Sequence, residues 1–352
     1  MNKILLIIIS LYSILLSQDV RYIDEIFDEV IKTENVVYGN APDLPFWFWV
    51  ESNTVDIDLD MDIYEPVGDT LTNRPVIIFA HTGSFFSGHN ETDDMVDLSI
   101  SAAKRGYVAI SINYRLGLNI ISTYSGERAV YRAVQDGGAA IRYLREFPEE
   151  FGINPDQIFM WGSSAGALIA LHLSYLDDED RPVATYGGGG DPDLGCPICE
   201  GNDYVHDPKP NAIVSCWGAI GDLDWIGDNN QIPTILFHGT LDPIVPFETG
   251  FPFTINITLP VVYGSSPIHD KLNELRKLGF TTAQIAPDGG IFQGRSSLVQ
   301  ISNQPKILSN EIAQIIEFKS GGWGAKQYPT SLLGAIAFVR QGFIDAAWYG
   351  KS

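Results

Sequence analysis

The chain has 352 residues, of which 45% are hydrophobic and 19% charged, which is ordinary for a globular protein with one large domain or two smaller ones. Its 44 acidic residues outnumber 22 basic ones, and the formal net charge is −22. Because such a surface repels phosphate backbones and anionic lipid, we expect no nucleic acid partner and attribute the acidity to solubility.

The N-terminal segment has the features of a secretory signal peptide. Lys3 supplies a positive charge, Ile4 to Leu16 form an apolar run too short for a comfortable membrane span, and Ser17 is a small residue suited to cleavage. We therefore expect residues 1–17 to be a Sec-type signal peptide. The mature chain is then secreted or periplasmic, with no membrane span. A membrane anchor formed by the same run is the alternative.

Strands and helices alternate along the next part of the chain. Apolar runs and alternating patterns predict strands over residues 55–66, 74–83, 106–117, 156–162, 211–220 and 233–243. Helical spacing predicts helices over residues 93–106, 127–152 and 164–176. All strands but the first are continuous apolar runs, typical of strands buried on both faces. This order predicts an α/β fold with a mostly parallel central sheet and helices on both faces, and residues 186–195 as a loop.

A G-x-S-x-G motif occupies residues 162–166, Gly-Ser-Ser-Ala-Gly, between the strand at 156–162 and the helix at 164–176. This context predicts a nucleophile elbow with Ser164 as the nucleophile, near the centre of the parallel sheet. The N-terminus of the following helix favours developing negative charge. The alternative is a Gly/Ser turn without chemistry.

Upstream, the stretch FAHTGSFFSG follows a predicted strand, as an oxyanion loop does in this arrangement. Backbone N–H groups of Gly83 and Ser84, together with that of Ala165, are candidates for the oxyanion hole, where one donor contributes about 3 kcal/mol. Thr82 and Ser84 stand where glycines are usual. We expect His81 to fix this loop and not to act as a base.

Downstream, FHGTLDPIVP places Asp242 just past a predicted strand. The chain order Ser, acid, His is that of α/β-hydrolases, which makes Asp242 the candidate acid. We expect Asp242 to follow a neighbouring parallel strand and to face a common pocket with Ser164. An aspartate that only holds a turn is the alternative.

With these motifs, residues 36–265 resemble the secreted carboxylesterases of the α/β-hydrolase fold, especially their bacterial feruloyl-esterase-like branch. Residues 133–158, AVQDGGAAIRYLREFPEEFGINPDQI, and the YGS at 263–265 also match. The resemblance implies an α/β-hydrolase domain over residues 18–270. It further implies hydrolysis of carboxylic esters, in small molecules or linked to a polymer, with no metal or other cofactor.

The resemblance also implies a base histidine in a Gly-rich loop after the last strand. Here a helix at 267–279, a strand at 280–287 and a loop at 288–294 are predicted, and Ile291 or Phe292 stands where the histidine belongs. Only His269 follows Asp242, and it arrives one element early, on the helix, where we expect a solvated surface residue. It is the only candidate base downstream. We therefore expect weak or absent esterase activity, with a non-catalytic protein that keeps the ester pocket as the alternative.

The tail, residues 271–352, resembles an internal stretch of the exported amidohydrolases related to imidazolonepropionase, a metal-dependent TIM-barrel family. The matching stretches are RKLGFTTAQIAPDGGIFQGRSSLVQI and YPTSLLGAIAFVRQGFIDAAWYG. It is far shorter than a barrel of about 250 residues and holds no metal-ligand set, so an amidohydrolase activity is disfavoured. We expect an irregular C-terminal appendage, from a recombined gene or a sequence-assembly artefact, that offers a substitute last strand.

The chain has three cysteines: Cys196, Cys199 and Cys216. In an exported protein a disulfide is the default, and Cys196–Cys199 is the favoured pair because Cys216 lies in a predicted buried strand. A zinc site formed by the three cysteines with His206 is the alternative, although its spacing fits no familiar pattern.

Overall fold

The computed structural model describes residues 20–45, 50–119, 122, 124–227, 230, 232–253, 259–276, 282–285, 292–295, 297–300, 306–309 and 314–316. The expected signal peptide, residues 1–17, lies outside these ranges. The chain divides into two compact units, Met1–Lys271 and Leu272–Ser352, which we describe separately. No helix in the described ranges combines the length and the apolar character needed to cross a membrane.

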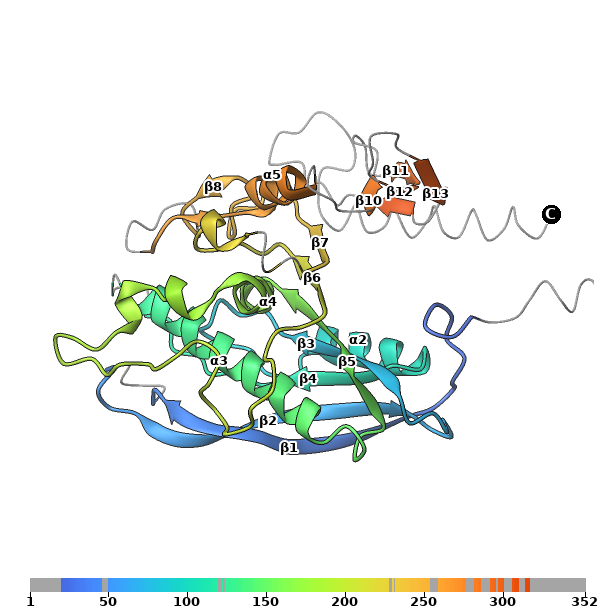
Figure 1. Ribbon diagram of the computed structural model, residues 1–352, viewed down its shortest axis with the longest axis horizontal. Coiled ribbons are helices and arrows are strands. Elements are labelled where there is room, and N and C mark those ends of the chain that lie inside the picture. The colour runs from blue at the N-terminus through green and yellow to red at the C-terminus, as the bar shows by residue number, and fades with distance from the viewer. Residues whose placement is uncertain are drawn as a thin grey trace, which may run out of the picture. The chain divides into compact units, whose positions relative to one another are not determined.

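The first unit is built on a seven-stranded sheet with the order β1-β2-β4-β3-β5-β6-β7 (Figure 1). Its strands are β1 Val30–Asp43, β2 Val55–Pro66, β3 Arg74–Ala80, β4 Val108–Ile112, β5 Ile153–Ser163, β6 Ala212–Cys216 and β7 Thr234–Phe237. The five strands from β4 to β7 pair in parallel, whereas β2 pairs antiparallel with both β1 and β4. The mostly parallel sheet expected from the sequence is confirmed.

Helices cover both faces of this sheet (Figure 1). They are α2 Asp93–Lys104, α3 Ser125–Glu146 and α4 Ala165–Tyr175. On one face, Met95 and Ala103 of α2 pack with Phe79 of β3 in an apolar cluster. On the other face, α3 and α4 pack against each other. The apolar runs therefore form the buried centre of the sheet, as their pattern predicts.

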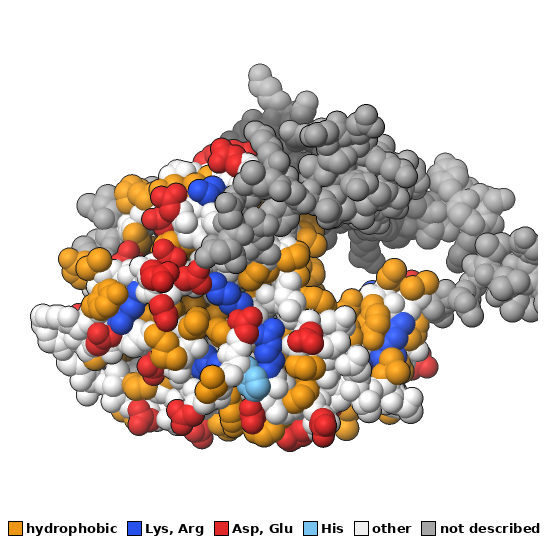
Figure 2. Space-filling model, in the orientation of Figure 1, with side chains coloured by type: hydrophobic (Ala, Val, Ile, Leu, Met, Phe, Trp, Pro, Cys, Tyr) orange, Lys and Arg blue, Asp and Glu red, His pale blue; other side chains and the backbone are white. Residues whose placement is uncertain are grey.

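The remaining elements of this unit are short, apart from α5, which begins in this unit and ends beyond its last residue, Lys271. They are η1 Asp178–Asp180, η2 Val183–Thr185, η3 Leu223–Trp225, β8 Thr249–Gly250, β9 Val262–Tyr263 and α5 Ser265–Arg276. Helix α5 corresponds to the helix predicted over residues 267–279. Figure 2 shows acidic side chains scattered over the visible face and not gathered in one patch, which fits a role in solubility.

Strand β1 is an element that the sequence patterns did not reveal. It pairs with β2 along its whole length, from Val30 opposite Pro66 to Asp43 opposite Val55, with two register irregularities. Its sequence, VIKTENVVYGNAPD, has no continuous apolar run and no sustained alternation. An edge strand with polar residues on both sides gives little periodic signal.

Side chains of α3 hold the long loop that follows α4. Arg128 donates to the carbonyl oxygens of Ala184 and Pro192 at 2.9 and 2.8 Å. Gln135 donates to the carbonyl oxygens of Leu194 and Cys196, and Arg142 to those of Ile198 and Glu200. Within this loop Cys196 and Cys199 form a disulfide with a Cα–Cα distance of 5.6 Å, whereas Cys216 is a buried free cysteine.

Strand β7 differs from the buried strand that its apolar run predicts. Ile235 and Phe237 are 48% and 46% exposed, while Thr234 and Leu236 are half-buried. The prediction of burial on both faces is wrong here because, among the described elements, β6 packs closely with β7 but no helix covers its faces to the same extent. Among the described strands, only β6 pairs with it.

The second unit contains short antiparallel strands. Strands β10 Thr282–Ile285, β12 Ser297–Gln300 and β13 Lys306–Ser309 form one sheet, and β11 Phe292–Arg295 pairs with β14 Gln314–Ile316. The strand predicted over 280–287 corresponds to β10, but the loop predicted over 288–294 enters β11 at Phe292. None of these strands belongs to the seven-stranded sheet, so the described residues supply no substitute strand beyond β7.

Candidate active site

Ser164 lies on a sharp turn between the end of β5 and the start of α4. Its backbone has φ 51° and ψ −114°, a strained conformation for a residue with a side chain. Its N–H donates to the carbonyl oxygen of Cys216 at the end of β6, at 2.9 Å. Because β5 lies between β3 and β6 near the centre of the sheet, Ser164 occupies the position that the motif predicts.

The two glycines of the motif are required by close backbone approach. A methyl group at Gly162 would overlap the carbonyl oxygen of Gly166, and one at Gly166 would overlap that of Ala80 on β3. The N–H of Gly166 also donates to the carbonyl oxygen of His81 at 3.1 Å. Strand, turn and helix therefore pack so closely that only glycine fits at both positions.

The loop after β3 has an unusual run of left-handed conformations. Gly83, Ser84 and Phe85 have φ values of 126°, 55° and 57°. The carbonyl oxygen of Gly83 accepts hydrogen bonds from the N–H groups of Phe86 and Ser87. The N–H groups of Ser84 and Ala165 make no hydrogen bond within the described part of the chain. These two N–H groups are therefore available to an oxyanion.

His81 holds this loop, as the sequence suggests. It is 1% exposed, its Nδ1 lies 2.6 Å from the carbonyl oxygen of Thr82, and its ring stacks on Tyr114 with centroids 4.1 Å apart. Burial lowers the pKa of His81 to about 4. The imidazole is therefore neutral near pH 7, and its contacts are those of a structural residue.

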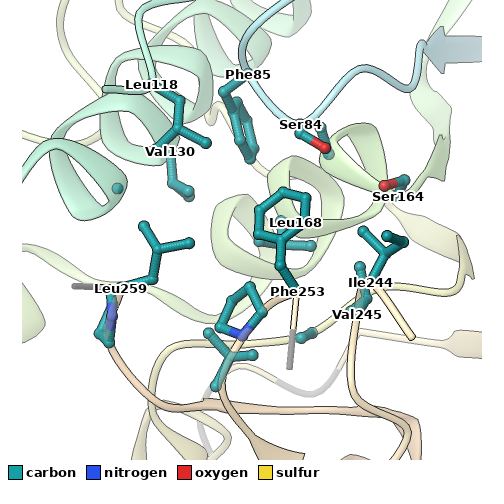
Figure 3. A pocket seen from close by; sticks show the side chains of 16 residues that line it. Ser84, Phe85, Leu118, Val130, Ser164, Leu168, Ile244, Val245, Phe253 and Leu259 are labelled. Atoms are coloured by element: carbon teal, nitrogen blue, oxygen red, sulfur yellow. The ribbon is translucent and has the colours of Figure 1, made fainter. Parts of the chain in front are cut away.

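A narrow apolar pocket of about 80 Å³ opens at Ser164. Ser84, Ala165 and Ser164 line it together, whereas Gly83 is not among its lining residues. In Figure 3 the hydroxyls of Ser84 and Ser164 lie near one end, and Leu118 and Leu259 lie at the other. The structure thus brings the candidate nucleophile and two of the three candidate oxyanion residues to one site.

Asp242 follows β7, one strand further from Ser164 than expected, because β6 lies between β5 and β7. All three strands run parallel, so both residues follow strand ends on the same edge of the sheet. Asp242 Oδ1 accepts hydrogen bonds from the N–H groups of Ile244 and Val245 at 2.8 and 3.0 Å. Through these two hydrogen bonds Asp242 holds the turn that carries Ile244 and Val245. Ile244 and Val245 line the pocket, whereas Asp242 does not.

His238 is a site residue that the sequence analysis missed. Its side chain is fully buried, with Nδ1 2.9 Å from the hydroxyl of Ser265 and Nε2 3.1 Å from the carbonyl oxygen of Val245. Nε2 also lies 3.7 Å from Asp242 Oδ2, and burial lowers the pKa of His238. The ring therefore connects the loop that contains Asp242 and Val245 to Ser265 at the start of α5. Its place four residues before Asp242 was the only sequence signal.

The histidines do not complete a triad at Ser164. Five of the six have hydrogen-bond partners elsewhere: His81 with Thr82, His89 with Glu91, His172 with Leu168, His206 with Glu146, and His238 with Ser265 and Val245. His269 is exposed on α5, as expected for a helix-surface residue. Of the two positions where a base histidine was sought, Ile291 lies outside the described residues and Phe292 begins β11.

Potential metal ligands do not gather in the described ranges. No group of three or more His, Cys, Asp or Glu side chains there is placed to hold a metal ion. Cys196 and Cys199 bond to each other, and His206 Nε2 lies 2.7 Å from Glu146 Oε2. These contacts leave the alternative zinc site without its ligand set.

In a comparison with known proteins, residues 61–223 match the BD-FAE family model. The chain has the α/β-hydrolase fold. Human Neuroligin-2 is 36% identical over 109 residues, which cover 31% of this chain and 12% of that protein. Para-nitrobenzyl esterase of Bacillus subtilis (strain 168) is 30% identical over 99 residues, covering 27% of this chain and 20% of that protein.

Solved structures with a similar arrangement include the apo form of Thermogutta terrifontis esterase 2. It is 21% identical, with a TM-score of 0.42, and the alignment covers 65% of this chain and 78% of that one. The chain spans only about a tenth of the length of the first curated relatives that it matches. The family match ends at residue 223, before Asp242 and the tail, so the amidohydrolase resemblance of the tail stays a prediction.

Proposed function

We propose that this chain is a carboxylic-ester hydrolase in which Ser164 is the nucleophile. One observation carries the proposal: Ser164 is held in a strained elbow and lines an apolar pocket together with Ser84 and Ala165, whose N–H groups have no hydrogen-bond partner among the described residues. This combination serves attack on a carbonyl carbon. The similarity to a para-nitrobenzyl esterase supports the same reaction class.

In the proposed reaction, Ser164 Oγ attacks the ester carbonyl carbon and loses its proton. The N–H groups of Ser84 and Ala165 stabilise the resulting oxyanion, and the alcohol leaves with a proton as the acyl-enzyme forms. Water then attacks the acyl-enzyme and releases the carboxylic acid. The substrate is a small-molecule ester or an ester group on a polymer.

We expect removal of the proton from Ser164 Oγ to limit the reaction at this site. Asp242 would orient a base imidazole, but the hydrogen bonds of the five histidines described above go to groups other than Ser164, and His269 is exposed on α5. Loss of a triad member leaves only about 10³–10⁴-fold catalysis over water. We therefore expect slow hydrolysis. The same observation favours a second candidate function, a non-catalytic protein that binds esters in the pocket.

Labelling with a fluorophosphonate separates these two functions. We expect slow, stoichiometric labelling of the wild type and none of the Ser164→Ala variant. Ser163→Ala is the matched control, since Ser163 is a buried neighbour at the end of β5 and should leave labelling intact. Absence of labelling in the wild type would support the binding protein.

We also propose that residues 1–17 are removed on export and that the protein acts outside the cytoplasm. The apolar run between Lys3 and Ser17 supports this. Expression of the full gene with N-terminal sequencing of the exported product tests it. A mature chain starting near residue 18 is expected, and an exported or retained chain that still begins at Met1 would contradict it.

A further inference from the structure

Residues 81–85, which we call the oxyanion loop, have a backbone shape that neighbouring groups must hold in place. Gly83, Ser84 and Phe85 all have positive φ values. Because Ser84 and Phe85 carry side chains, this region is disfavoured for them and persists only where the surroundings fix it. The direction of the Ser84 N–H depends on this backbone shape. The groups that fix the oxyanion loop are therefore part of what prepares the candidate site.

Tyr114 holds the start of the oxyanion loop. It belongs to residues 113–118, the support loop, which follows β4. The Tyr114 hydroxyl donates to the carbonyl oxygen of His81 at 2.8 Å, and its ring stacks on the imidazole. The same carbonyl oxygen accepts a hydrogen bond from the N–H of Gly166, in the elbow, at 3.1 Å. The His81 carbonyl thus connects the oxyanion loop to both Tyr114 and the elbow.

The support loop also holds the other end of the oxyanion loop. The N–H groups of Gly117 and Leu118 donate to the carbonyl oxygen of Phe85 at 2.8 and 3.0 Å. The rings of Phe85 and Tyr114 lie with their centroids 6.0 Å apart. One short segment therefore contacts the oxyanion loop on either side of Ser84.

The support loop is itself anchored in the interior of the domain. Arg115 donates to the Asp136 carboxylate of α3 from its N–H at 2.7 Å and from Nε at 2.9 Å, and both side chains are at most 4% exposed. The N–H of Asn113 donates to the carbonyl oxygen of Asp60 on β2 at 3.0 Å. Because its neighbours on both sides are fixed, Tyr114 gives the oxyanion loop a rigid support.

Tyr114 itself lies outside the pocket. It is 5% exposed and is not among the residues that line the pocket. Burial raises the pKa of Tyr114, so its hydroxyl keeps its proton and remains a donor. Any effect of Tyr114 on the reaction must therefore pass through the groups that it contacts.

We infer that Tyr114 is a positioning residue for the oxyanion loop, in which its hydroxyl, bonded to the His81 carbonyl oxygen, fixes the direction of the Ser84 N–H. The inference rests on the proposed ester chemistry at Ser164. Tyr114 takes no part in the bond changes. Without its hydroxyl, the peptide between His81 and Thr82 is freer to turn and the Ser84 N–H shifts.

The kinetics of fluorophosphonate labelling test this role. In labelling, Ser164 Oγ bonds to phosphorus, fluoride leaves, the serine proton passes to water, and the phosphoryl oxygen takes up charge that the oxyanion donors stabilise. Tyr114→Phe removes only the hydroxyl. It should lower the labelling rate at saturating reagent by about 10–100-fold, because the donor is displaced and not deleted. The reagent concentration for half-maximal rate should stay within about twofold, since the pocket is retained.

Two further variants show whether position or general stability is responsible. Tyr131→Phe is the matched control, since Tyr131 is 2% exposed and its hydroxyl donates to the carbonyl oxygen of Gly195 at 2.8 Å, away from the pocket. It should label like the wild type, with a similar loss of stability in urea. Replacing Tyr114 with 4-aminophenylalanine keeps a donor at the same place and should restore most of the rate.

A measurement without chemistry accompanies the labelling. The N–H groups of Phe86 and Ser87 donate to the carbonyl oxygen of Gly83, and their hydrogen exchange reports on the shape of the oxyanion loop. Exchange of both should be about tenfold faster in Tyr114→Phe and unchanged in Tyr131→Phe.

The inference is wrong if Tyr114→Phe labels and exchanges like the wild type, or if Tyr131→Phe loses as much rate. A raised half-maximal concentration with an unchanged limiting rate would also overturn it, because the effect would then be on binding. A wild type that no concentration of reagent labels loses the proposed function instead. Exchange at Phe86 and Ser87 then decides on its own whether Tyr114 holds the oxyanion loop.

Discussion

The centre of the sheet and its β7 edge contribute differently to the candidate site. At the centre, Ile78 of β3 and Met160 of β5 are at most 1% exposed, and the elbow is packed so closely that its glycines have no room for a side chain. At the edge, Ile235 and Phe237 of β7 are nearly half exposed. The candidate nucleophile Ser164 and the candidate oxyanion residues belong to the centre, and the loop that carries Asp242, the candidate acid, belongs to the edge.

This difference follows from which segments of the sequence form each part. The elbow depends on consecutive elements, β5 and α4, and on their contacts with β3 and β6. An acid and a base depend on strands and loops added later along the chain. The elbow can therefore form independently of the later loops that would carry an acid and a base.

The largest expected effect is the loss of a buried side chain at the centre. Ile78→Ala should lower the free energy of unfolding by about 2–5 kcal/mol, because Ile78 is fully buried. Ile235→Ala makes the same chemical change on β7 and should cost less than half as much. Urea denaturation of both variants checks the comparison. Equal losses would show that β7 is as well covered as the centre.

Close packing at the elbow gives the next prediction. Gly166→Ala should destabilise the fold by about 1–3 kcal/mol or more, since its methyl group would overlap the Ala80 carbonyl, and should abolish labelling of Ser164. Gly188→Ala, where a methyl group meets nothing within 4 Å, should stay within about 0.5 kcal/mol of the wild type. A stable, normally labelled Gly166→Ala protein would mean that the turn is looser than described.

The buried histidines should make the free energy of unfolding depend on pH. Burial lowers the pKa values of His81 and His172 to about 4, so both are neutral when folded, whereas the unfolded chain binds protons below about pH 6.5. Stability should therefore fall as the pH drops from 6.5 to 4, by about 2–3 kcal/mol for each histidine. His81→Gln should remove about half of this combined loss. If the free energy of unfolding falls as much between pH 6.5 and pH 4.5 in His81→Gln as in the wild type, the prediction is wrong.

The smallest effect is expected away from both regions, at the disulfide. Cys196 and Cys199 close a short loop, so replacing both with serine should cost at most about 2 kcal/mol. Labelling of Ser164 should not change, because Gln135 and Arg142 still hold the loop carbonyls. Loss of labelling in this variant would connect the loop to the site.

The sequence was most informative where structure is local. The strand-to-helix context of Ser164 predicts its elbow because the motif and both flanking elements are contiguous. The burial of β7 was mispredicted because an apolar run does not reveal whether helices cover both faces of its strand. His238 was missed because its partner Ser265 lies 27 residues away, and β1 because a polar edge strand has no periodic signal. The positions of Leu118 and Leu259 along one pocket could not be read from the chain at all.

The central claim is that Ser164 is a prepared nucleophile without its base. Hydrolysis of p-nitrophenyl butyrate by the wild type, Ser164→Ala and His269→Ala, measured side by side, tests it most directly. We predict slow wild-type turnover that disappears in Ser164→Ala and is nearly unchanged in His269→Ala. Fast wild-type turnover that is abolished by His269→Ala, or turnover that survives in Ser164→Ala, would contradict it.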